Sequence, residues 1–276
     1  MNEGNSAKID PEVSSDFVRA LAKGLAVIEA FDAQAQSMTL SDVARKTGLS
    51  RGTARRLLLT LTELGYAGFD GKRFSLQPKV LGLGFAYLYS QDLWQLAQPS
   101  MVELVEKVHE SCSVAVLDGT DIVYVARVPT AARIMSINLG IGTRLPAFFT
   151  SMGRVLLGGL AAEDLKRLIA RVSPLPQYTS KTITDPKALL REIEAARRQG
   201  WALVDQELEQ GLRSIAAPVM DCDGRPIAAL NVGTQATRWT IQRLTQEALP
   251  LLRETATAIS ALLAPDNRAR GPQGRR

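Results

Sequence analysis

The chain has 276 residues, of which 46% are apolar and 22% charged, and its formal net charge is +5. This length is sufficient for two domains with cores of their own, and the composition is that of a globular protein. The sequence has no apolar run of roughly 18 residues and no apolar segment near its N-terminus. We therefore expect no membrane helix, no signal peptide and a cytoplasmic location.

The single histidine and the two cysteines argue against several kinds of chemistry. His109 is the only histidine, and Cys112 and Cys222 lie far apart in the sequence, so a metal site or a histidine-assisted nucleophile would have few groups to use. His109 and Cys112 could share a helix face, but two unrelated residues at a helix end are the better interpretation. We expect no enzymatic activity, no metal and no cofactor.

The N-terminal region predicts a polar arm followed by a helix. Residues 1–15 are polar, and we expect them to be disordered. Ser15 or Asp16 is predicted to cap a helix that runs to about Phe31, because apolar residues recur there at helical spacing.

The stretch from Thr39 to Leu64 predicts two short helices joined by a tight turn. Thr39 and Asp42 have the spacing of a capping box, and Gly48 can take the left-handed conformation that often ends a helix. Ser50 is expected to cap the second helix, whose apolar residues recur with a period of 3.6 and bury one face. Off that face lie Arg51, Thr53, Arg55 and Arg56, as expected of a helix that enters the DNA major groove.

A basic hairpin is predicted directly after these helices. Aromatic and apolar residues flank Asp70-Gly71, a pair typical of hairpin turns, and Lys72 and Arg73 follow the tip. Residues 45–73 carry seven basic and two acidic side chains, a net charge of 7 − 2 = +5. A solvated helix face would also carry such charge, but the helix-turn-helix pattern favours a winged helix-turn-helix domain over residues 16–77 that binds double-stranded DNA.

Two further helices are predicted between this domain and the next. Residues 78–91 form the first, which begins at Pro78 and is either a linker or a dimer surface. The second runs from Leu93 to Glu110 and is expected to be interrupted near Pro99.

Beyond residue 110 the pattern becomes a mixture of strands and helices. The predicted elements are, in order, a hairpin around Asp118-Gly119, a strand at 133–139, a loop at 140–146, an apolar helix at 154–160, helices at 163–171 and 186–199, three strands within 201–234 and a closing helix at 241–263. An antiparallel sheet flanked by helices, without a βαβ repeat, is an α+β domain that can hold a small molecule. Residues 265–276 predict a disordered basic tail.

Four stretches of this sequence carry a resemblance to a known family: LAKGLAVIEAF, LPAFFTSMGRVLLGGL, WALVDQELEQGLRSIAAPV and AALNVGTQ. Together with the order of the domains, they resemble the IclR (isocitrate lyase regulator) family of bacterial transcription factors. The sequences of these stretches are similar to those of the family branch that controls aromatic-acid degradation through the β-ketoadipate pathway. The resemblance covers residues 16 to 264.

The resemblance implies a fold and a set of partners. It implies an α+β protein in which a winged helix-turn-helix is joined by a linker helix to a GAF-like effector-binding and oligomerisation domain over residues 92–264. It also implies a homodimer or a dimer of dimers, a palindromic operator, a small organic acid as effector, and contact with RNA polymerase if the protein is an activator. Whether it activates or represses depends on where the operator lies.

The residue pattern predicts the DNA-binding residues, and the family resemblance implies most of the effector-binding residues. The predicted DNA-binding residues are Thr39, Ser50, Arg51, Thr53, Arg55, Arg56, Lys72 and Arg73. The resemblance places the effector-binding residues at Ser151, Met152, Gly153, Asp205, Ser214, Asn231, Gly233 and Thr234. Arg133 and Arg144 are added because an aromatic acid needs a cation, although a surface or structural role for each is equally compatible with the sequence.

Other interpretations remain open at this point. An IclR-type regulator could respond to a non-aromatic metabolite, the chain could be an enzyme with a basic domain, or it could be a sensor that acts only through protein contacts. Asp205, Glu207 and Glu209 alternate and could be a catalytic pair or metal ligands, but a structural or effector-contact role is preferred. Trp201 and Trp239 could stack on an aromatic effector, although core packing is the better interpretation of each.

Overall fold

The computed structural model describes residues 16–32, 34–89, 93–130 and 139–262. The chain divides into two compact units, residues 1–89 and 90–276. The expected polar arm, the basic tail, Arg133 and nearly all of the predicted strand at 133–139 lie outside the described residues. Within the described ranges, no helix is long and apolar enough to cross a membrane.

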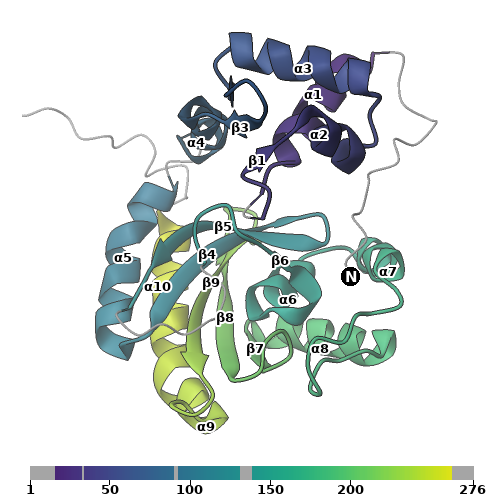
Figure 1. Ribbon diagram of the computed structural model, residues 1–276. Coiled ribbons are helices and arrows are strands. Elements are labelled where there is room, and N and C mark those ends of the chain that lie inside the picture. Colours follow the sequence, from purple (N-terminus) through teal and green to yellow (C-terminus); the bar gives the residue numbers. More distant parts are fainter. Residues whose placement is uncertain (1–15, 33, 90–92, 131–138, 263–276) are drawn as a thin grey trace, which may run out of the picture. The chain divides into compact units, whose positions relative to one another are not determined.

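The first unit is a small helical domain with a three-stranded sheet (Figure 1). Its elements are α1 (Arg19–Glu29), β1 (Ser37–Met38), α2 (Leu40–Thr47), α3 (Arg51–Glu63), β2 (Ala67–Phe69), β3 (Phe74–Leu76), the 3-10 turn η1 (Pro78–Val80) and α4 (Leu81–Tyr89). The antiparallel sheet has the order β1-β3-β2, so the predicted basic hairpin pairs with a short strand that the sequence pattern had not indicated. This is the arrangement of a winged helix-turn-helix.

The ends of α2 and α3 confirm the predicted capping chemistry. The Thr39 hydroxyl accepts the Asp42 backbone N–H while the Asp42 carboxylate accepts the Thr39 backbone N–H, so both halves of the capping box are present. Gly48 ends α2 with φ 67°, and the Ser50 hydroxyl caps α3 by accepting the Thr53 N–H. The beginning of α1 differs from the prediction, because the helix starts after Val18, which makes no side-chain cap.

The second unit is built on a six-stranded antiparallel sheet with the order β6-β5-β4-β9-β8-β7. Its strands are β4 (Ser111–Asp118), β5 (Asp121–Val128), β6 (Arg144–Pro146), β7 (Ala202–Asp205), β8 (Leu212–Met220) and β9 (Pro226–Gln235). Its helices are α5 (Leu93–Val108), η2 (Ala147–Phe149), α6 (Ser151–Leu157), α7 (Ala162–Arg171), α8 (Pro186–Gln199), α9 (Ile241–Arg243), the π-turn η3 (Leu244–Ala248) and α10 (Leu249–Ala261). Helices α5 and α10 cover one face of the sheet and α6 the other (Figure 1).

Helix α6 is the centre of this unit because every residue in it is buried. It packs against β8, β9 and β7 on one side and against α8 on the other. Gly153 makes the close packing possible, since a Cβ at this position would lie 2.0 Å from the carbonyl oxygen of Ala147. Helix α6 therefore provides a rigid floor, and any polar group on it must find a buried partner.

Three sequence expectations in this unit are corrected. Helix α5 continues through Pro99 without interruption; this proline is exposed, so water can reach the carbonyl it leaves unpaired. The stretch 140–146 is not all loop, because its last three residues form β6 at the sheet edge. The closing helix is not uniform but passes through a π-turn just before Pro250, a residue that cannot donate an α-helical hydrogen bond.

Candidate functional site

The first candidate site is the exposed side of α3. Arg51, Arg55 and Arg56 are exposed, whereas Ala54, Leu58 and Leu61 of the same helix are buried in the core of the first unit. No ion pair joins the three arginines to a carboxylate of the described residues. By contrast, Arg45 of α2 is paired with Asp42 at 2.7 Å. The arginines of α3 thus have no acidic partner among the described residues, and their side chains are exposed.

The hydroxyl groups near this face are already engaged within the domain. Ser50 and Thr53 lie 3.0 Å apart at their hydroxyl oxygens, and Ser50 also caps α3. Thr39 holds the capping box of α2. These three predicted DNA-binding residues therefore have a structural role: Thr39 holds the start of α2, and Ser50 and Thr53 hold the start of α3, which carries the arginines.

The hairpin between β2 and β3 carries the two remaining predicted contacts. Lys72 and Arg73 are both exposed, and their backbone N–H groups bind the carboxylate of Asp70, which lowers the pKa of Asp70. The side chain of Arg73 donates to the backbone oxygen of Ser37 at 2.9 Å. Arg73 therefore ties the hairpin to β1, while Lys72 projects from the tip.

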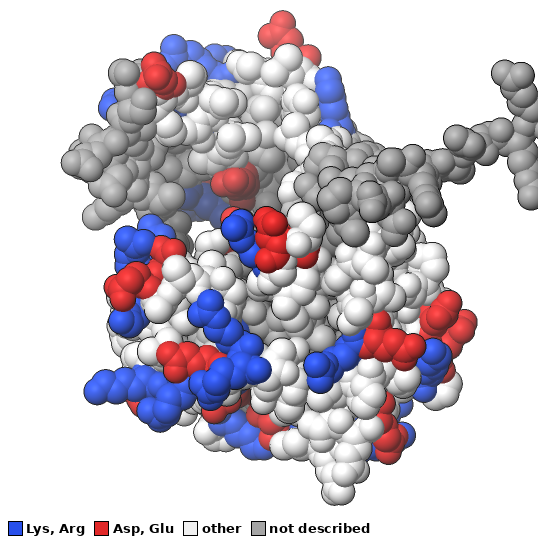
Figure 2. Space-filling model, turned by 180° about the vertical axis from the view of Figure 1, so that it is seen from behind, with Lys and Arg blue, Asp and Glu red and all other residues white. Residues whose placement is uncertain are grey.

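Charge is distributed differently on the second unit. On the face seen in Figure 2, its blue basic side chains lie among red acidic ones. Pairs such as Lys166 with Glu163 and Arg243 with Glu247 join them directly. On α8 (Pro186–Gln199), however, Arg191, Arg197 and Arg198 are exposed and make no ion pair with the described residues, so exposed basic charge is present on both units.

The second candidate site is a cavity in the second unit, between the sheet and the start of α6. Its lining is Ser111, Ser113, Tyr124, Arg127, Leu139, Leu145, Phe149, Thr150, Ser151, Met152, Val204, Glu207, Leu208, Leu212, Ser214, Asn231 and Gly233. Its volume is about 40 Å³, room for only a few water molecules.

The polar lining comes from cross-strand neighbours on one face of the sheet. Ser113 of β4 lies opposite Arg127 of β5 on one side and Asn231 of β9 on the other, and Ser214 of β8 lies opposite Gly233 of β9. Because alternate residues of a strand share a face, these groups form one surface. Further along the same face, Ala115, Ala216 and Ala229 belong to the apolar core around α6.

A β-bulge brings Arg127 to this surface. Ala115 pairs with Tyr124, whereas Ser113, two residues away, pairs with Arg127, three residues further along β5. The extra residue on β5 puts Tyr124 and Arg127 on the same face, which simple alternation would forbid. The Arg127 guanidinium donates to the Ser113 hydroxyl at 3.1 Å, and burial raises the pKa of Tyr124 to about 12.

Two polar groups at the cavity have hydrogen-bonding capacity left. The Ser151 hydroxyl donates to the Ser214 hydroxyl at 2.9 Å, which leaves the hydrogen of Ser214 available. The Oδ1 atom of Asn231 is buried and accepts no hydrogen bond from the described residues. A ligand that offers both an acceptor and a donor would satisfy these two groups.

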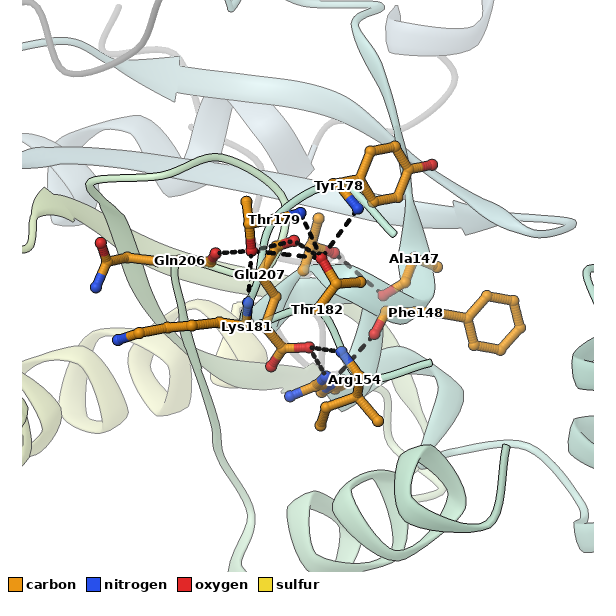
Figure 3. A network of polar contacts seen from close by, with 11 residues as sticks. Ala147, Phe148, Arg154, Tyr178, Thr179, Lys181, Thr182, Gln206 and Glu207 are labelled. Atoms are coloured by element: carbon orange, nitrogen blue, oxygen red, sulfur yellow. Dashed lines mark hydrogen bonds and ion pairs between the residues drawn. The ribbon is translucent and has the colours of Figure 1, made fainter. Parts of the chain in front are cut away.

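A buried network forms the wall beyond Glu207 (Figure 3). The carboxylate of Glu207 accepts from Arg154 of α6 at 2.6 Å and from the backbone of Ile183 at 3.4 Å. Thr182 donates to the backbone oxygen of Glu207 at 2.6 Å, and Thr179 to that of Gln206 at 2.7 Å. The segment before α8 and the turn after β7 are thereby held against α6.

The structure brings together only part of the predicted effector site. Ser151, Met152, Ser214, Asn231 and Gly233 line the cavity. Gly153, Asp205 and Thr234 do not. Gly153 is the close contact of α6 described above, Asp205 binds Lys181 and Arg213, and the buried Thr234 hydroxyl donates to the backbone of Arg213.

Arg144, the arginine predicted for the effector site within the described residues, lies away from the cavity lining. Its side chain is half exposed and is paired with Asp118 at 2.6 Å and Asp121 at 3.3 Å, which raises its pKa. It therefore does not line the cavity, and among the described residues Arg127 supplies the cation there. Sequence reasoning missed Arg127 because the bulge that turns it inward is a feature of strand pairing.

The acidic alternation and the tryptophans also have defined places. Strand β7 ends at Asp205, so Asp205, Glu207 and Glu209 do not form one strand face. Glu207 binds Arg154 and also lines the cavity, so both roles preferred from the sequence, structural and effector contact, are open to it. Trp239 is buried and its indole N–H donates to Glu110 at 3.0 Å. Neither Trp201 nor Trp239 lines the cavity.

Comparison with known proteins identifies the family to which both units belong. Residues 20–71 match the IclR helix-turn-helix domain, and residues 85–261 match the family described as bacterial transcriptional regulator IclR C-terminal. The Pca regulon regulatory protein of Pseudomonas putida is 46% identical over 237 residues, 86% of this chain and 81% of that protein. The p-hydroxybenzoate hydroxylase transcriptional activator of Acinetobacter baylyi is 39% identical over 254 residues, 91% of this chain and 93% of that protein.

Solved structures show the same fold. A Rhodococcus sp. RHA1 protein assigned as a transcriptional regulator is 51% identical, with a TM-score of 0.78 over 90% of this chain and 98% of that one. An IclR homologue from Microbacterium hydrocarbonoxydans, in complex with 4-hydroxybenzoate, is 27% identical, with a TM-score of 0.76 over 91% of this chain and 99% of that one. The chain belongs to the IclR family of bacterial transcriptional regulators.

Proposed function

We propose that this protein is a DNA-binding regulator of aromatic-compound catabolism whose second unit binds a small organic acid. Two observations support this proposal: the arginines on α3, which make no ion pair with the described residues, and the cavity that Arg127 lines, which carries it. The names of the relatives in Pseudomonas and Acinetobacter and the 4-hydroxybenzoate complex of the Microbacterium homologue support the aromatic role. In domain terms, residues 16–77 bind DNA, 78–91 form the linker helix and 92–264 form the effector-binding and oligomerisation domain.

For DNA binding we propose direct reading of the major groove by α3. Arg51, Arg55 and Arg56 are suited to guanine edges and phosphates, and Lys72 to the phosphates beside them. The caps of the two helices, Thr39, Ser50 and Thr53, would lie close to the DNA backbone while they hold the helix ends. Arg73 would position the hairpin. The resulting contact is with double-stranded DNA in the cytoplasm.

A palindromic operator needs two copies of α3 related by symmetry, so we propose a homodimer, or a dimer of such dimers. Exposed apolar side chains on the first unit support this. Leu21 of α1 is 63% exposed and Leu81 of α4 is 62% exposed, and apolar surface of this kind marks an interaction site. If the operator lies upstream of a promoter, RNA polymerase is the partner that the dimer would contact.

Effector control follows from the small volume of the cavity. The cavity admits only a few water molecules, and we propose that its lining moves apart when a larger aromatic acid binds. A ligand that fits only the expanded state binds that state better, and this difference is the condition for shifting a conformational equilibrium.

The test combines DNA binding with ligand binding in one full-length preparation. Calorimetry with 4-hydroxybenzoate, protocatechuate, cis,cis-muconate and β-ketoadipate is expected to show binding of at least one acid, and that acid is expected to change the apparent affinity for operator DNA. Specific DNA binding without a response to any of the four would reject the aromatic role and favour a non-aromatic metabolite. Failure to protect any DNA in footprinting would reject the regulator itself.

A further inference from the structure

A second cavity of the second unit lies at an edge of the sheet. Strand β7 forms this edge, and α8 and α9 line the cavity together with it, at the lower end of the unit in Figure 1. The cavity has a volume of about 260 Å³, compared with about 40 Å³ for the cavity that Arg127 lines, and the two share no lining residue. Its size is close to the roughly 300–1,000 Å³ of pockets that hold small molecules.

The second cavity reaches around the edge of β7. Ala202 and Leu203 are consecutive in this strand and point to opposite faces of the sheet, yet both line the cavity. Ala202 belongs to the core around α6, so one part of the cavity lies on the α6 side of the sheet. Leu203 lies on the other side, where it contributes to an apolar part of the lining. The cavity therefore has room for a ligand with a polar end and an apolar end.

Arg154 supplies a buried cation at the polar end. Its side chain is 2% exposed and lines the second cavity. Its Nη2 atom donates to Glu207 and its Nε atom to the backbone oxygen of Phe148, whereas Nη1 makes no hydrogen bond with the described residues. The N–H groups of Nη1 are thus available to a carboxylate oxygen, the acceptor that a guanidinium binds best.

Glu192 of α8 brings a negative charge to the same cavity. Its side chain is exposed and forms no ion pair with the part of the chain that the structure describes. Because Glu207 already neutralises Arg154, a simple carboxylate ligand would add a like charge beside Glu192, and like charges oppose each other. A ligand that carries both a carboxylate and an ammonium group would instead satisfy Arg154 and Glu192 together.

Trp201, Leu203 and Ile241 form the apolar end. Ile241 is 46% exposed, and Trp201 and Leu203 are half-buried, so apolar surface remains for a ligand to cover. The Gln199 side chain donates to the backbone oxygen of Trp201 at 2.8 Å and holds this end of β7 against α8. An aromatic ring packs well against an indole, and an ammonium group is also attracted to the face of tryptophan.

We propose that the second cavity binds a zwitterionic α-amino acid with an aromatic side chain. Its carboxylate binds Nη1 of Arg154, its ammonium group binds Glu192, and its ring packs against Trp201 and Leu203. This site goes beyond the proposed function, which places the effector in the other cavity.

The buried ion pair connects the two cavities, because Arg154 lines one and Glu207 lines the other. A ligand carboxylate on Arg154 takes a share of the positive charge that otherwise neutralises Glu207. The negative charge of Glu207 then acts more strongly on the cavity that Arg127 lines, and an organic acid binds there more weakly. The two ligands are therefore expected to oppose each other's binding, a consequence that rests on the proposed function.

Calorimetry of the full-length protein tests the site with three compounds that share a phenyl ring. L-Phenylalanine carries both charges, 3-phenylpropionate lacks the ammonium group, and phenethylamine lacks the carboxylate. We expect L-phenylalanine to bind about tenfold more tightly than either of the others, because each of them leaves one charged group of the cavity without its hydrogen bonds. Absence of phenylalanine binding, or equal binding of either analogue, would overturn the inference.

Glu192→Gln tests the named contact without disturbing the buried ion pair, since Glu192 is exposed. We expect this variant to bind L-phenylalanine about tenfold more weakly and 3-phenylpropionate no more weakly than the original protein does. Glu194→Gln is the matched control, because Glu194 is also exposed on α8 but does not line the cavity. Unchanged phenylalanine affinity in Glu192→Gln would show that the ammonium group is not bound there and would overturn the inference.

A titration with 4-hydroxybenzoate in the presence of saturating L-phenylalanine measures the coupling. We expect its affinity to fall about fivefold, and we expect this fall to be lost in Glu192→Gln. An unchanged or increased affinity would overturn the coupling between the cavities. If 4-hydroxybenzoate does not bind even without phenylalanine, the coupling fails together with the proposed function, whereas the phenylalanine titrations still decide the second site.

Discussion

Arg154 and Glu207 form a buried ion pair, with 2.6 Å between Nη2 and Oε2 and with side-chain exposures of 2% and 8%. Arg154 lies in the middle of the fully buried α6, and Glu207 lines the cavity in the turn after β7. The Arg154 side chain also donates to the backbone oxygen of Phe148 at 3.2 Å. The pair therefore couples the floor of the cavity to its wall.

Breaking this pair should destabilise the second unit. Arg154→Met or Glu207→Gln leaves one member of the pair in a buried site without its counter-charge, at an expected cost of about 3–5 kcal/mol. The double variant Arg154→Met/Glu207→Gln should be less destabilised than the sum of the single changes, since no unpaired charge remains. Urea unfolding of all four proteins measures this coupling, and additive losses would contradict it.

Arginine variants separate DNA reading from surface charge. Arg55→Ala and Arg56→Ala should each weaken operator binding, by about 1–3 kcal/mol where the arginine reads a base, because neither residue makes an ion pair with the part of the chain that the structure describes. Arg45→Ala is the control, since the Arg45 side chain is paired with Asp42. Gel-shift titration measures operator affinity and calorimetry confirms that effector affinity is unchanged; wild-type operator binding by both variants would refute the role of α3.

Two glycines should respond oppositely to the same substitution. Gly153→Ala forces a Cβ against the backbone of Ala147, and overpacking of this kind costs about 1–3 kcal/mol or more. Gly233→Ala meets no atom within 4 Å, so it should preserve stability but reduce effector affinity by occupying the cavity. Thermal unfolding and calorimetry on both variants give the comparison, and equal stability losses would contradict it.

Arg127 and Arg144 make a second matched pair. Arg127→Gln should reduce affinity for an aromatic carboxylate at least tenfold, because it removes the only cation among the described lining residues. Arg144→Gln breaks two surface ion pairs and should leave that affinity unchanged, at a small cost in stability. A larger effect at Arg144 than at Arg127 would return the carboxylate site to the position predicted from the sequence.

Glu110 should make stability depend on pH. It is fully buried, and burial is the largest influence on its pKa, which is raised despite the opposing effect of Arg238 and the hydrogen bond from Trp239. A raised pKa means that the folded state holds the proton more tightly, so this contribution to stability is present below the unfolded pKa of about 4.5 and is lost as the pH rises through the folded pKa. Glu110→Gln keeps an acceptor for Trp239 and should flatten the fall in stability above pH 4.5, measured by urea unfolding at several pH values; an identical pH profile would contradict this.

The sequence by itself determined the local elements and the family. Several local features depend only on neighbours within a few residues, so they can be predicted from the sequence. They include the capping pair of Thr39 with Asp42, the left-handed Gly48 and the apolar period of α3. The same holds for the hairpins, whereas the resemblance, which spans both domains, predicted Ser151, Ser214 and Asn231 as effector-site residues.

Only the tertiary structure decided which side chains meet. A bulge in β5 turned Arg127 into the cavity, ion pairs with Asp118 and Asp121 held Arg144 outside it, and close packing gave Gly153 a structural role. The pairing of Arg154 with Glu207 joins residues 53 positions apart. These outcomes depend on strand register and on partners distant in the chain, and no local pattern of residues encodes either one.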